Sequence, residues 1–472
     1  MAYLTNAGAI IREACGGYKR SGSFSQNYLA VLSGTGLNIL IQVIVSPVLA
    51  RIYGPEAYGM YALFTAICSN FAMLATMRFP QAFLLPKEDR EFHVLMRLSF
   101  LTSIALSIVV SLFLAFNGGA FLKALKAESL MPYFYLIPVM ILLISANQIF
   151  GQWQYRLNVF KKSVAIDTSL LVSVRFFNLI FGWLTNGMHI GLILGDGLGK
   201  IAGLILSVGF IIKGQIREAF SRISFLQMKE VFLAYKAYPL INLPGVWLVL
   251  TSEQLPFFLL TSKFGLPALG VLAFAISMLD LPKRLFAYSV SSVFYKKAVD
   301  LYAESFSRFQ DAVTKMFYGL LLLSAVPYSI IFIFGPMLFT FVFGVDWELS
   351  GKLAQYLALY YVLELICVSF DAVFYTLRKE KQLFHFQISA FAGRFAVLLT
   401  AVYAFETLEL CIASLMAFNV VLYSVQLITV LRYLKLPAFK FFIHLVSIMG
   451  LLVALMAGLK MFLDYLFNNL KF

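Results

Sequence analysis

The sequence has little charge for its length. Only 13% of its 472 residues are Asp, Glu, Lys or Arg, whereas 61% are hydrophobic and 16% are aromatic. A soluble domain has about 25% charged residues, so a water-soluble protein of this composition would expose apolar side chains over most of its surface. The 48 Phe and 24 Tyr also exclude a disordered chain. A polytopic membrane protein remains.

Cysteine and enzyme motifs are also scarce. The four cysteines (Cys15, Cys68, Cys367 and Cys411) form no CxxC pair and have no metal-ligand spacing, so we expect neither disulfides nor a metal site. The sequence contains no Walker A motif, no GxSxG, no HExxH and no Gly-rich dinucleotide motif. We therefore expect no catalytic residue, no cofactor and no ATP hydrolysis by the chain itself.

Long apolar runs dominate the sequence. They are continuous over about 20 residues, the length of a membrane-spanning helix, and lack the alternation of an outer-membrane barrel strand. We predict an all-α polytopic membrane protein with about 13 transmembrane helices. The predicted spans are 28–50, 59–79, 94–116, 132–152, 164–184, 187–212, 238–260, 266–289, 316–338, 353–377, 384–404, 408–431 and 441–466.

The net charge of +14 has two possible explanations. In a soluble protein it would suggest nucleic-acid binding. In a membrane protein, Lys and Arg concentrate in the cytosolic loops. With a cytosolic tail at residues 1–27, the inner segments hold 27 of the 37 basic residues and the outer segments hold seven. The distribution favours a cytosolic N-terminus and no nucleic-acid partner. The outer loops are short, the longest being 117–131 and 339–352, so the function must reside in the helices.

Two turns in the sequence repeat one pattern. YGPEAYGMYA at 53–62 and FGLPALGVLA at 264–273 place two glycines in register, at an offset of 211 residues. A Gly-x4-Gly turn can recur by chance, but each copy follows an apolar helix that contains a proline. We predict two pseudo-symmetric six-helix bundles, at 28–212 and 238–431, joined by an amphipathic cytosolic linker at 213–237. An extra helix and a tail follow at 432–472. Parallel repeats of this kind suit alternating access.

Several stretches resemble one family of membrane proteins. They are LARIYGPEAYGMYALF at 49–64, RFPQAFLLPKED at 78–89, QWQYRLNVFKKSVAID at 152–167, FGLPALGVLAFAISMLDLPKRL at 264–285, VSSVFYKKA at 290–298 and LFTFVFGVDWELSGKLAQYL at 338–357. In this order they resemble the polysaccharide transporter (O-antigen or lipid-linked oligosaccharide flippase) family. That family belongs to the MATE-like multidrug/oligosaccharidyl-lipid/polysaccharide exporter superfamily. The family often carries an acidic residue where this chain has Pro80, so no role of that carboxylate transfers.

The resemblance implies a function. The chain is expected to flip undecaprenyl-pyrophosphate-linked oligosaccharides from the cytoplasmic to the periplasmic leaflet of a bacterial inner membrane, for O-antigen, capsule or exopolysaccharide. Membrane lipids, an H⁺ or Na⁺ gradient and other polysaccharide assembly proteins are the expected partners. The alternative from the same superfamily is a cation-coupled exporter of small amphipathic drugs. A glycan polymerase or ligase would need a large outer loop, and a simple channel would lack the repeat.

Basic residues within the spans are candidates for binding the pyrophosphate, because a charge at membrane depth usually faces a cavity or a partner. Arg175 and Arg394 lie near the middle of their spans, and Lys200 lies one turn after Asp196, on the same helical face. We predict that Arg175, Lys200 and Arg394 line a central cavity, although Asp196 and Lys200 also suit a structural ion pair. Arg78 is expected at the cytosolic mouth, either as a head-group ligand or as a topology anchor.

Acidic residues within the spans are candidates for cation coupling or for pairing with these bases. Glu364 and Asp371 are seven residues apart, on nearly one face of their helix. Arg394 has no acidic neighbour one turn away on its own helix, so we expect it to pair with Glu364, with Asp371 or with the pyrophosphate. Asp196 and Glu253 complete the set, Glu253 in a polar patch before a proline. Asp280, followed by Pro282, Lys283 and Arg284, is expected at the interface.

Overall fold

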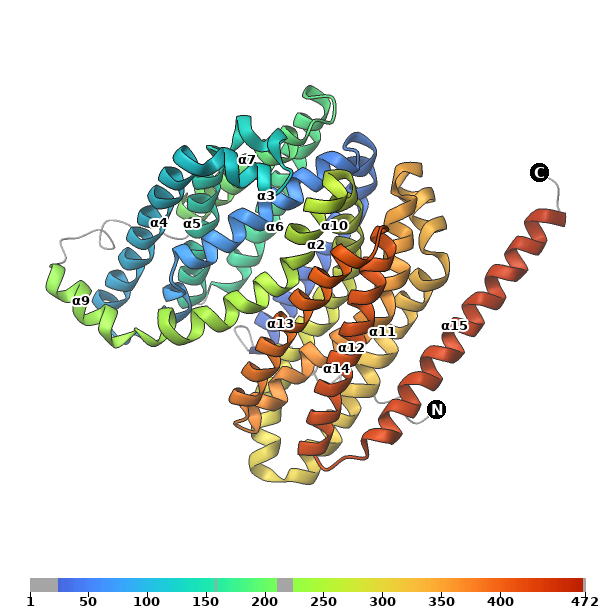
Figure 1. The fold of residues 1–472 in the computed structure, drawn as a ribbon. Helices are drawn as coiled ribbons and strands as arrows, with labels where there is room; N and C mark the ends of the chain where they lie inside the picture. The colour runs from blue at the N-terminus through green and yellow to red at the C-terminus, as the bar shows by residue number, and fades with distance from the viewer. Residues whose placement is uncertain (1–23, 158, 210–223, 470–472) are drawn as a thin grey trace. The chain divides into compact units, whose positions relative to one another are not determined.

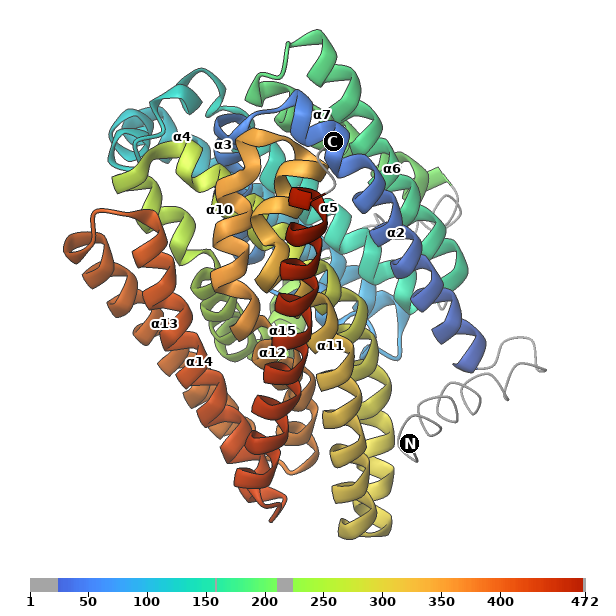
Figure 2. The ribbon, with the colours of Figure 1, turned by 90° about the vertical axis from the view of Figure 1, so that its right-hand side faces the viewer.

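The computed structural model describes residues 24–157, 159–209 and 224–469, and their regular structure is entirely helical. Most of the predicted tail at 1–27 and part of the predicted linker at 213–237 lie outside these residues. Contacts divide the chain into unit 1, Met1–Gly270, and unit 2, Val271–Phe472. This division groups contacts rather than repeats, so the predicted domain boundaries stay predictions. Figures 1 and 2 show the helices from two directions.

Unit 1 contains the first ten helical segments that the structure describes, together with the start of an eleventh. They are α2 (Phe24–Ile52), α3 (Pro55–Ala75), η1 (Phe79–Ala82), α4 (Asp89–Ala124), η2 (Glu128–Tyr133), α5 (Leu136–Arg156), α6 (Phe160–Leu184), α7 (His189–Ser207), α9 (Phe225–Ala234) and η4 (Tyr238–Asn242). Helix α10 (Leu243–Glu304) begins in unit 1 and continues into unit 2.

Unit 2 is built from longer helices. After α10 come α11 (Phe306–Phe343), η5 (Val345–Trp347), α12 (Glu348–Thr376), α13 (Glu380–Ala404), α14 (Leu408–Tyr433) and α15 (Ala438–Asn469). Most side chains of α12 are buried, which makes it the core helix of the unit. Helix α15 packs on α11 and α14, and its C-terminal end extends away from them (Figures 1 and 2).

Twelve helical stretches of the described residues are long and apolar enough to cross a membrane. All thirteen predicted spans fall on them, because spans 238–260 and 266–289 share the stretch Tyr238–Ala287. The backbone interrupts this stretch at Gly265, where φ is 78° and ψ is −178°. Glycine adopts a positive φ without the steric cost of a Cβ atom. Because the regular structure of the described residues is entirely helical and includes these spanning stretches, the all-helical prediction is confirmed.

The first part of α10, up to Gly265, packs antiparallel to α3. Asn70 accepts a hydrogen bond of 2.8 Å from the Thr251 hydroxyl and donates another to Gln254. The Gln254 amide in turn donates to the Ser69 hydroxyl at 3.2 Å. In a bilayer, hydrogen bonds of this kind add to van der Waals packing in holding two apolar helices together. This part of α10 therefore belongs to unit 1 by its contacts.

The two turns of the sequence repeat meet in the structure. A Cβ atom on Gly59 would lie 1.9 Å from the carbonyl oxygen of Leu266, and one on Gly270 would lie 1.7 Å from that of Pro55. The offset of 211 residues converts Gly59 into Gly270 and Pro55 into Leu266, so one contact is the symmetry copy of the other. Reciprocity of this kind defines an isologous two-fold contact. It supports the predicted repeat.

A stripe of glycines brings α7 against α6. Gly195, Gly199 and Gly203 recur every fourth residue, and a Cβ atom on each would collide with Asn178, Val174 or Leu170 of α6, respectively. Small residues at this spacing let two membrane helices approach closely. The stripe therefore fixes how α6 presents the polar side chains next to these contacts.

One arginine joins two of the stretches that carry the family resemblance. Arg156, at the end of α5, donates hydrogen bonds to the carbonyl oxygens of Phe83 and Pro86 at 2.8 and 2.9 Å. It also contacts Asp89 at 3.0 Å and lies 4.7 Å from the centroid of the Phe92 ring. The fork of the guanidinium thus fixes the connection between η1 and α4.

We expect Arg156→Lys to destabilise this connection. A lysine has one nitrogen and no planar group, so it cannot bond the two carbonyl oxygens while a second nitrogen bonds Asp89 and the plane lies over Phe92. The lost contacts should cost about 1–3 kcal/mol. The exposed contact with Asp89 should add little. The midpoint of thermal unfolding in detergent should fall for Arg156→Lys and stay unchanged for the exposed control Arg90→Lys on α4. Equal midpoints for both variants would contradict the role of Arg156.

Candidate functional site

Unit 1 contains a buried ion pair in the middle of α7. Lys200 forms a salt bridge and hydrogen bond with Asp196, one turn earlier, as the sequence spacing predicts. Asp196 is 4% exposed, and its charge acts on the Tyr61 hydroxyl of α3. The Asn147 amide of α5 donates to the carbonyl oxygen of Lys200 at 3.3 Å. Three helices therefore share this pair, and the Lys200 charge is already balanced.

Arg175 lies near the ion pair on α6. Its guanidinium acts electrostatically on Tyr58 and Tyr61 of α3. Its Nε is buried and has no hydrogen-bond partner among the residues that the structure describes. Asn178, one turn further along α6, is also completely buried, and neither atom of its amide is hydrogen-bonded there. A buried donor without a partner costs about 1–3 kcal/mol, so this region suits an additional polar group.

The other two predicted residues of unit 1 lie outside this region. Arg78 has a left-handed backbone (φ 60°) between α3 and η1, and its Nε donates to Asn242 Oδ1 at 3.2 Å. Partial burial lowers the pKa of Arg78 below its ordinary value, but the group remains a cation at neutral pH. Glu253 is exposed on α10, whereas its neighbours Thr251 and Gln254 contact α3.

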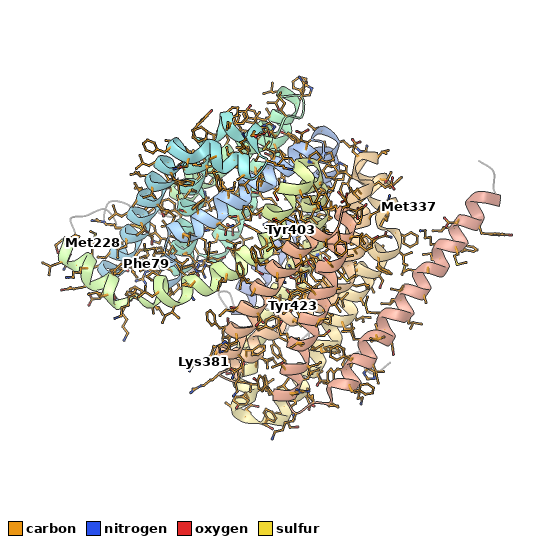
Figure 3. The ribbon with its side chains drawn as sticks, viewed as in Figure 1. Phe79, Met228, Met337, Lys381, Tyr403 and Tyr423 are labelled. Atoms are coloured by element: carbon orange, nitrogen blue, oxygen red, sulfur yellow. The ribbon has the colours of Figure 1, made fainter. Side chains whose placement is uncertain are left out.

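Unit 2 contains a longer chain of buried polar contacts, in which Tyr423 joins Arg394 to Glu364. Arg394 donates to Asn419 Oδ1 at 2.8 Å and to the Tyr423 hydroxyl at 2.9 Å. That hydroxyl donates in turn to Glu364 at 3.0 Å. Arg394 and Glu364 are only 8% and 3% exposed. Figure 3 labels Tyr423 on α14. The predicted partner Glu364 is thus reached through a tyrosine rather than directly.

Lys283 completes this chain, although the sequence pattern placed it with the interfacial charges. Its Nζ lies 3.3 Å from Glu364 and 2.9 Å from Asp280, and the residue is 6% exposed. Asp280 is also held inside unit 2, with 20% of its side chain exposed. The three-residue spacing of Asp280 and Lys283 was the available signal, because such neighbours pair on one helical face.

Tyrosines surround the ion pairs of unit 2. The ring of Tyr360 stacks parallel to that of Tyr423, with centroids 6.4 Å apart, and Lys283 Nζ lies 5.2 Å from the centroid of the Tyr361 ring. Tyr328 of α11 donates to the carbonyl oxygen of Leu279 at 2.9 Å. Rings of this kind satisfy cations and hydrogen bonds while remaining apolar enough for a helix interior.

Asp371 is set apart from this chain of contacts. Its Oδ1 accepts a hydrogen bond of 2.9 Å from the Gln426 amide of α14, and no salt bridge to Asp371 is seen among the described residues. The structure therefore gives the two carboxylates of α12 different surroundings. A lysine and a tyrosine flank Glu364, whereas an amide contacts Asp371. The described residues contain no group of three or more His, Cys, Asp or Glu side chains suited to a metal ion.

Comparison with protein families adds one match, and no curated protein matches the sequence. The model of the family described as "Polysaccharide biosynthesis protein" matches residues 24–295, which is more than half of the chain.

Solved structures share the fold at low sequence identity. A multidrug resistance MATE family transporter of the MOP superfamily, in an inward-facing conformation, has a TM-score of 0.67 at 15% identity; the match covers 86% of this chain and 98% of that one. The lipid II flippase MurJ, in an inward closed conformation, has a TM-score of 0.64 at 14% identity, with coverage of 94% and 99%. A MOP superfamily transporter from Pyrococcus furiosus has a TM-score of 0.55 at 13% identity, covering 87% and 94%.

Proposed function

Because the chain belongs to the polysaccharide biosynthesis protein family, we propose that it flips undecaprenyl-pyrophosphate-linked oligosaccharides between the leaflets of a bacterial inner membrane. The family and the fold are those of transporters and flippases rather than enzymes. The proposed direction is from the cytoplasmic to the periplasmic leaflet, for O-antigen, capsule or exopolysaccharide, by alternating access. The proposed topology has a cytosolic N-terminus.

The observation that carries this proposal is the state of Arg175. Among the predicted basic ligands, Lys200 is paired with Asp196, Arg394 is bonded to Asn419 and Tyr423, and Arg78 is bonded to Asn242. Arg175 instead keeps a buried Nε without a described partner. A guanidinium in this state is suited to a pyrophosphate, which accepts charge-assisted hydrogen bonds in pairs. We therefore assign the head group to Arg175 first.

We further propose that the carboxylates of α12 couple transport to an H⁺ or Na⁺ gradient. The negative charge of Glu364 is balanced by Lys283, and its carboxylate accepts a hydrogen bond from Tyr423. Asp371 contacts an amide, which carries no charge. Binding of H⁺ or Na⁺ there would therefore change the net charge around the carboxylate more than it would at Glu364. In this proposal Arg394 acts on Glu364 through Tyr423. In unit 1, Asp196 and Glu253 are the proposed residues for cation coupling or for pairing with a base. The alternative, a drug exporter, needs a mainly acidic cavity, whereas Asp196 and Glu364 each already contact a lysine.

Flipping in proteoliposomes tests the proposal. Vesicles containing the purified chain and an undecaprenyl-pyrophosphate-linked oligosaccharide should expose glycan to an added glycosidase faster than empty vesicles do. Arg175→Ala should reduce this rate by about tenfold or more, since removing a buried charged contact costs at least 1.4 kcal/mol. Arg175→Lys should restore it only in part. Lys162→Ala, at an exposed position of the same helix, should transport normally.

The contrary outcomes are distinct. If Arg175→Ala inserts and transports glycan normally, the head-group assignment is wrong. If the vesicles move a fluorescent cationic drug and leave the glycan lipid in place, the drug-exporter alternative replaces the proposal.

A further inference from the structure

Helix α9 is short and well defined at its start. Its N-terminus has a capping box, in which the Ser224 hydroxyl accepts a hydrogen bond from the Gln227 backbone amide and the Gln227 side chain accepts one from that of Ser224. A capping box satisfies two backbone donors and fixes the first turn. With ten residues, α9 is about 15 Å long, which is too short to cross a bilayer.

One face of α9 packs on the helices of unit 1. Phe232 contacts Phe79 edge to face, with ring centroids 5.8 Å apart, and Val231 joins the same apolar cluster. Helix α9 contacts α4, and burial of Tyr235, followed by the charge of Glu91 on α4, raises the pKa of Tyr235 to about 12. Figure 3 labels Phe79 and Met228 of α9 at the same end of unit 1. Helix α9 is thus held with a fixed rotation.

The opposite face of α9 is apolar and uncovered. Leu226 and Leu233, seven residues apart and therefore on one side of the helix, are 70% and 51% exposed. Lys229 and Glu230 lie on either side of this ridge and are exposed. A ridge of large apolar residues with charges at its edges is typical of a helix that lies in a membrane interface.

Nearby segments carry the same kind of residue. Leu240 and Ile241 of η4, at the start of the next candidate span, are 69% and 74% exposed. In the connection that Arg156 fixes, Leu84 and Leu85 are 60% and 59% exposed. Contacts between η1 and η4 place these two segments side by side. We call the exposed residues of α9, η4 and this connection the apolar platform.

The chain itself keeps the platform close to a bilayer. Helix α9 ends at Ala234 and the next spanning stretch begins at Tyr238, so the intervening residues reach at most about 14 Å. The connection with Leu84 and Leu85 likewise joins spanning helices α3 and α4. Exposed apolar side chains within that distance of a bilayer gain free energy by entering its interface, and Lys229 can extend its ammonium group toward the phosphates.

We propose that the apolar platform is an interfacial anchor that inserts into the boundary between phospholipid head groups and acyl chains of one leaflet. Its partner is the lipid surface itself, rather than a protein. The anchor holds η4 at a fixed depth in the membrane. Through the bond from Arg78 to Asn242 it also fixes the depth of the end of α3 that is predicted to face the cytosol. This role is independent of what the protein transports.

Spin labels test the anchor. Leu226→Cys and Leu233→Cys would each be labelled in a Cys15→Ser background, since the other three cysteines are buried, and reconstituted in phosphatidylethanolamine/phosphatidylglycerol nanodiscs. Both labels should relax faster with oxygen, which concentrates in lipid, than with a water-soluble nickel chelate. Glu304→Cys, at the exposed end of α10, is the matched control and should show the reverse order.

Two results would overturn the anchor. Labels at 226 and 233 that respond to the nickel chelate as the label at 304 does would place the ridge in water. Labels that respond to neither reagent would show that protein covers the ridge, from another part of the chain or from a second copy.

Discussion

Replacing Gly59 or Gly270 by leucine is expected to abolish transport. At this crossing the backbones of α3 and α10 are in direct contact, and even a Cβ atom on either glycine would lie within 2 Å of a carbonyl oxygen. Backbone atoms cannot move aside as a flexible side chain can, so the two helices must separate by several ångströms. Glycosidase protection of a lipid-linked glycan in proteoliposomes should therefore match that of empty vesicles, for either variant.

The turn itself supplies the controls for this prediction. Gly54 aligns with Gly265 in the repeat, yet Gly54 has an ordinary φ of −71° and nothing within 4 Å of an added Cβ atom. Gly54→Ala should therefore transport normally. Gly265→Ala should be impaired by backbone strain alone, at about 1–3 kcal/mol, since φ there is 78°. Normal transport by Gly59→Leu, in protein that inserts and accumulates, would show that the crossing is not needed.

Interactions between sequence neighbours were predictable. The Asp196–Lys200 pair follows from a spacing of four residues on a helix. The break at Gly265 follows from a glycine between two apolar runs of spanning length. The register of the repeat follows from two glycines at a constant offset. The first two depend on one or two turns of a helix, where geometry leaves few alternatives, and the third depends on a short pattern that the sequence contains twice.

Contacts between distant helices were not predictable from the same signals. In a helix of a soluble protein, the polar face is exposed, so the apolar face can be identified as the buried one. In a bilayer the outer surface of the protein is as apolar as its interior. Phe341 and Trp183, for example, are 81% exposed, whereas Trp347 is 1% exposed. The rotation of each helix therefore leaves little trace in the sequence. Lys283, 81 residues from Glu364, was for this reason assigned to the interface.

Lys283→Met is expected to destabilise the folded protein strongly. It leaves Glu364 and Asp280 without their nearest cation, in a helix interior where removing one partner of a buried pair costs about 3–5 kcal/mol. Glu364→Gln should cost less, because Lys283 keeps Asp280 as a partner. Adding Glu364→Gln to Lys283→Met should recover part of the loss. Thermal unfolding of the two single variants and the double variant measures the coupling.

Tyr423, which joins Glu364 to Arg394, extends the same argument to Arg394. Tyr423→Phe keeps the ring that stacks on Tyr360 but removes the hydroxyl that accepts from Arg394 and donates to Glu364. Two buried charged groups then lack one partner each, which should cost about 2–3 kcal/mol. Tyr403→Phe, at a position 83% exposed, should cost nothing measurable. If the effects of Lys283→Met and Glu364→Gln simply add, and Tyr423→Phe is as stable as Tyr403→Phe, then the buried chain from Lys283 to Arg394 does not act as one unit.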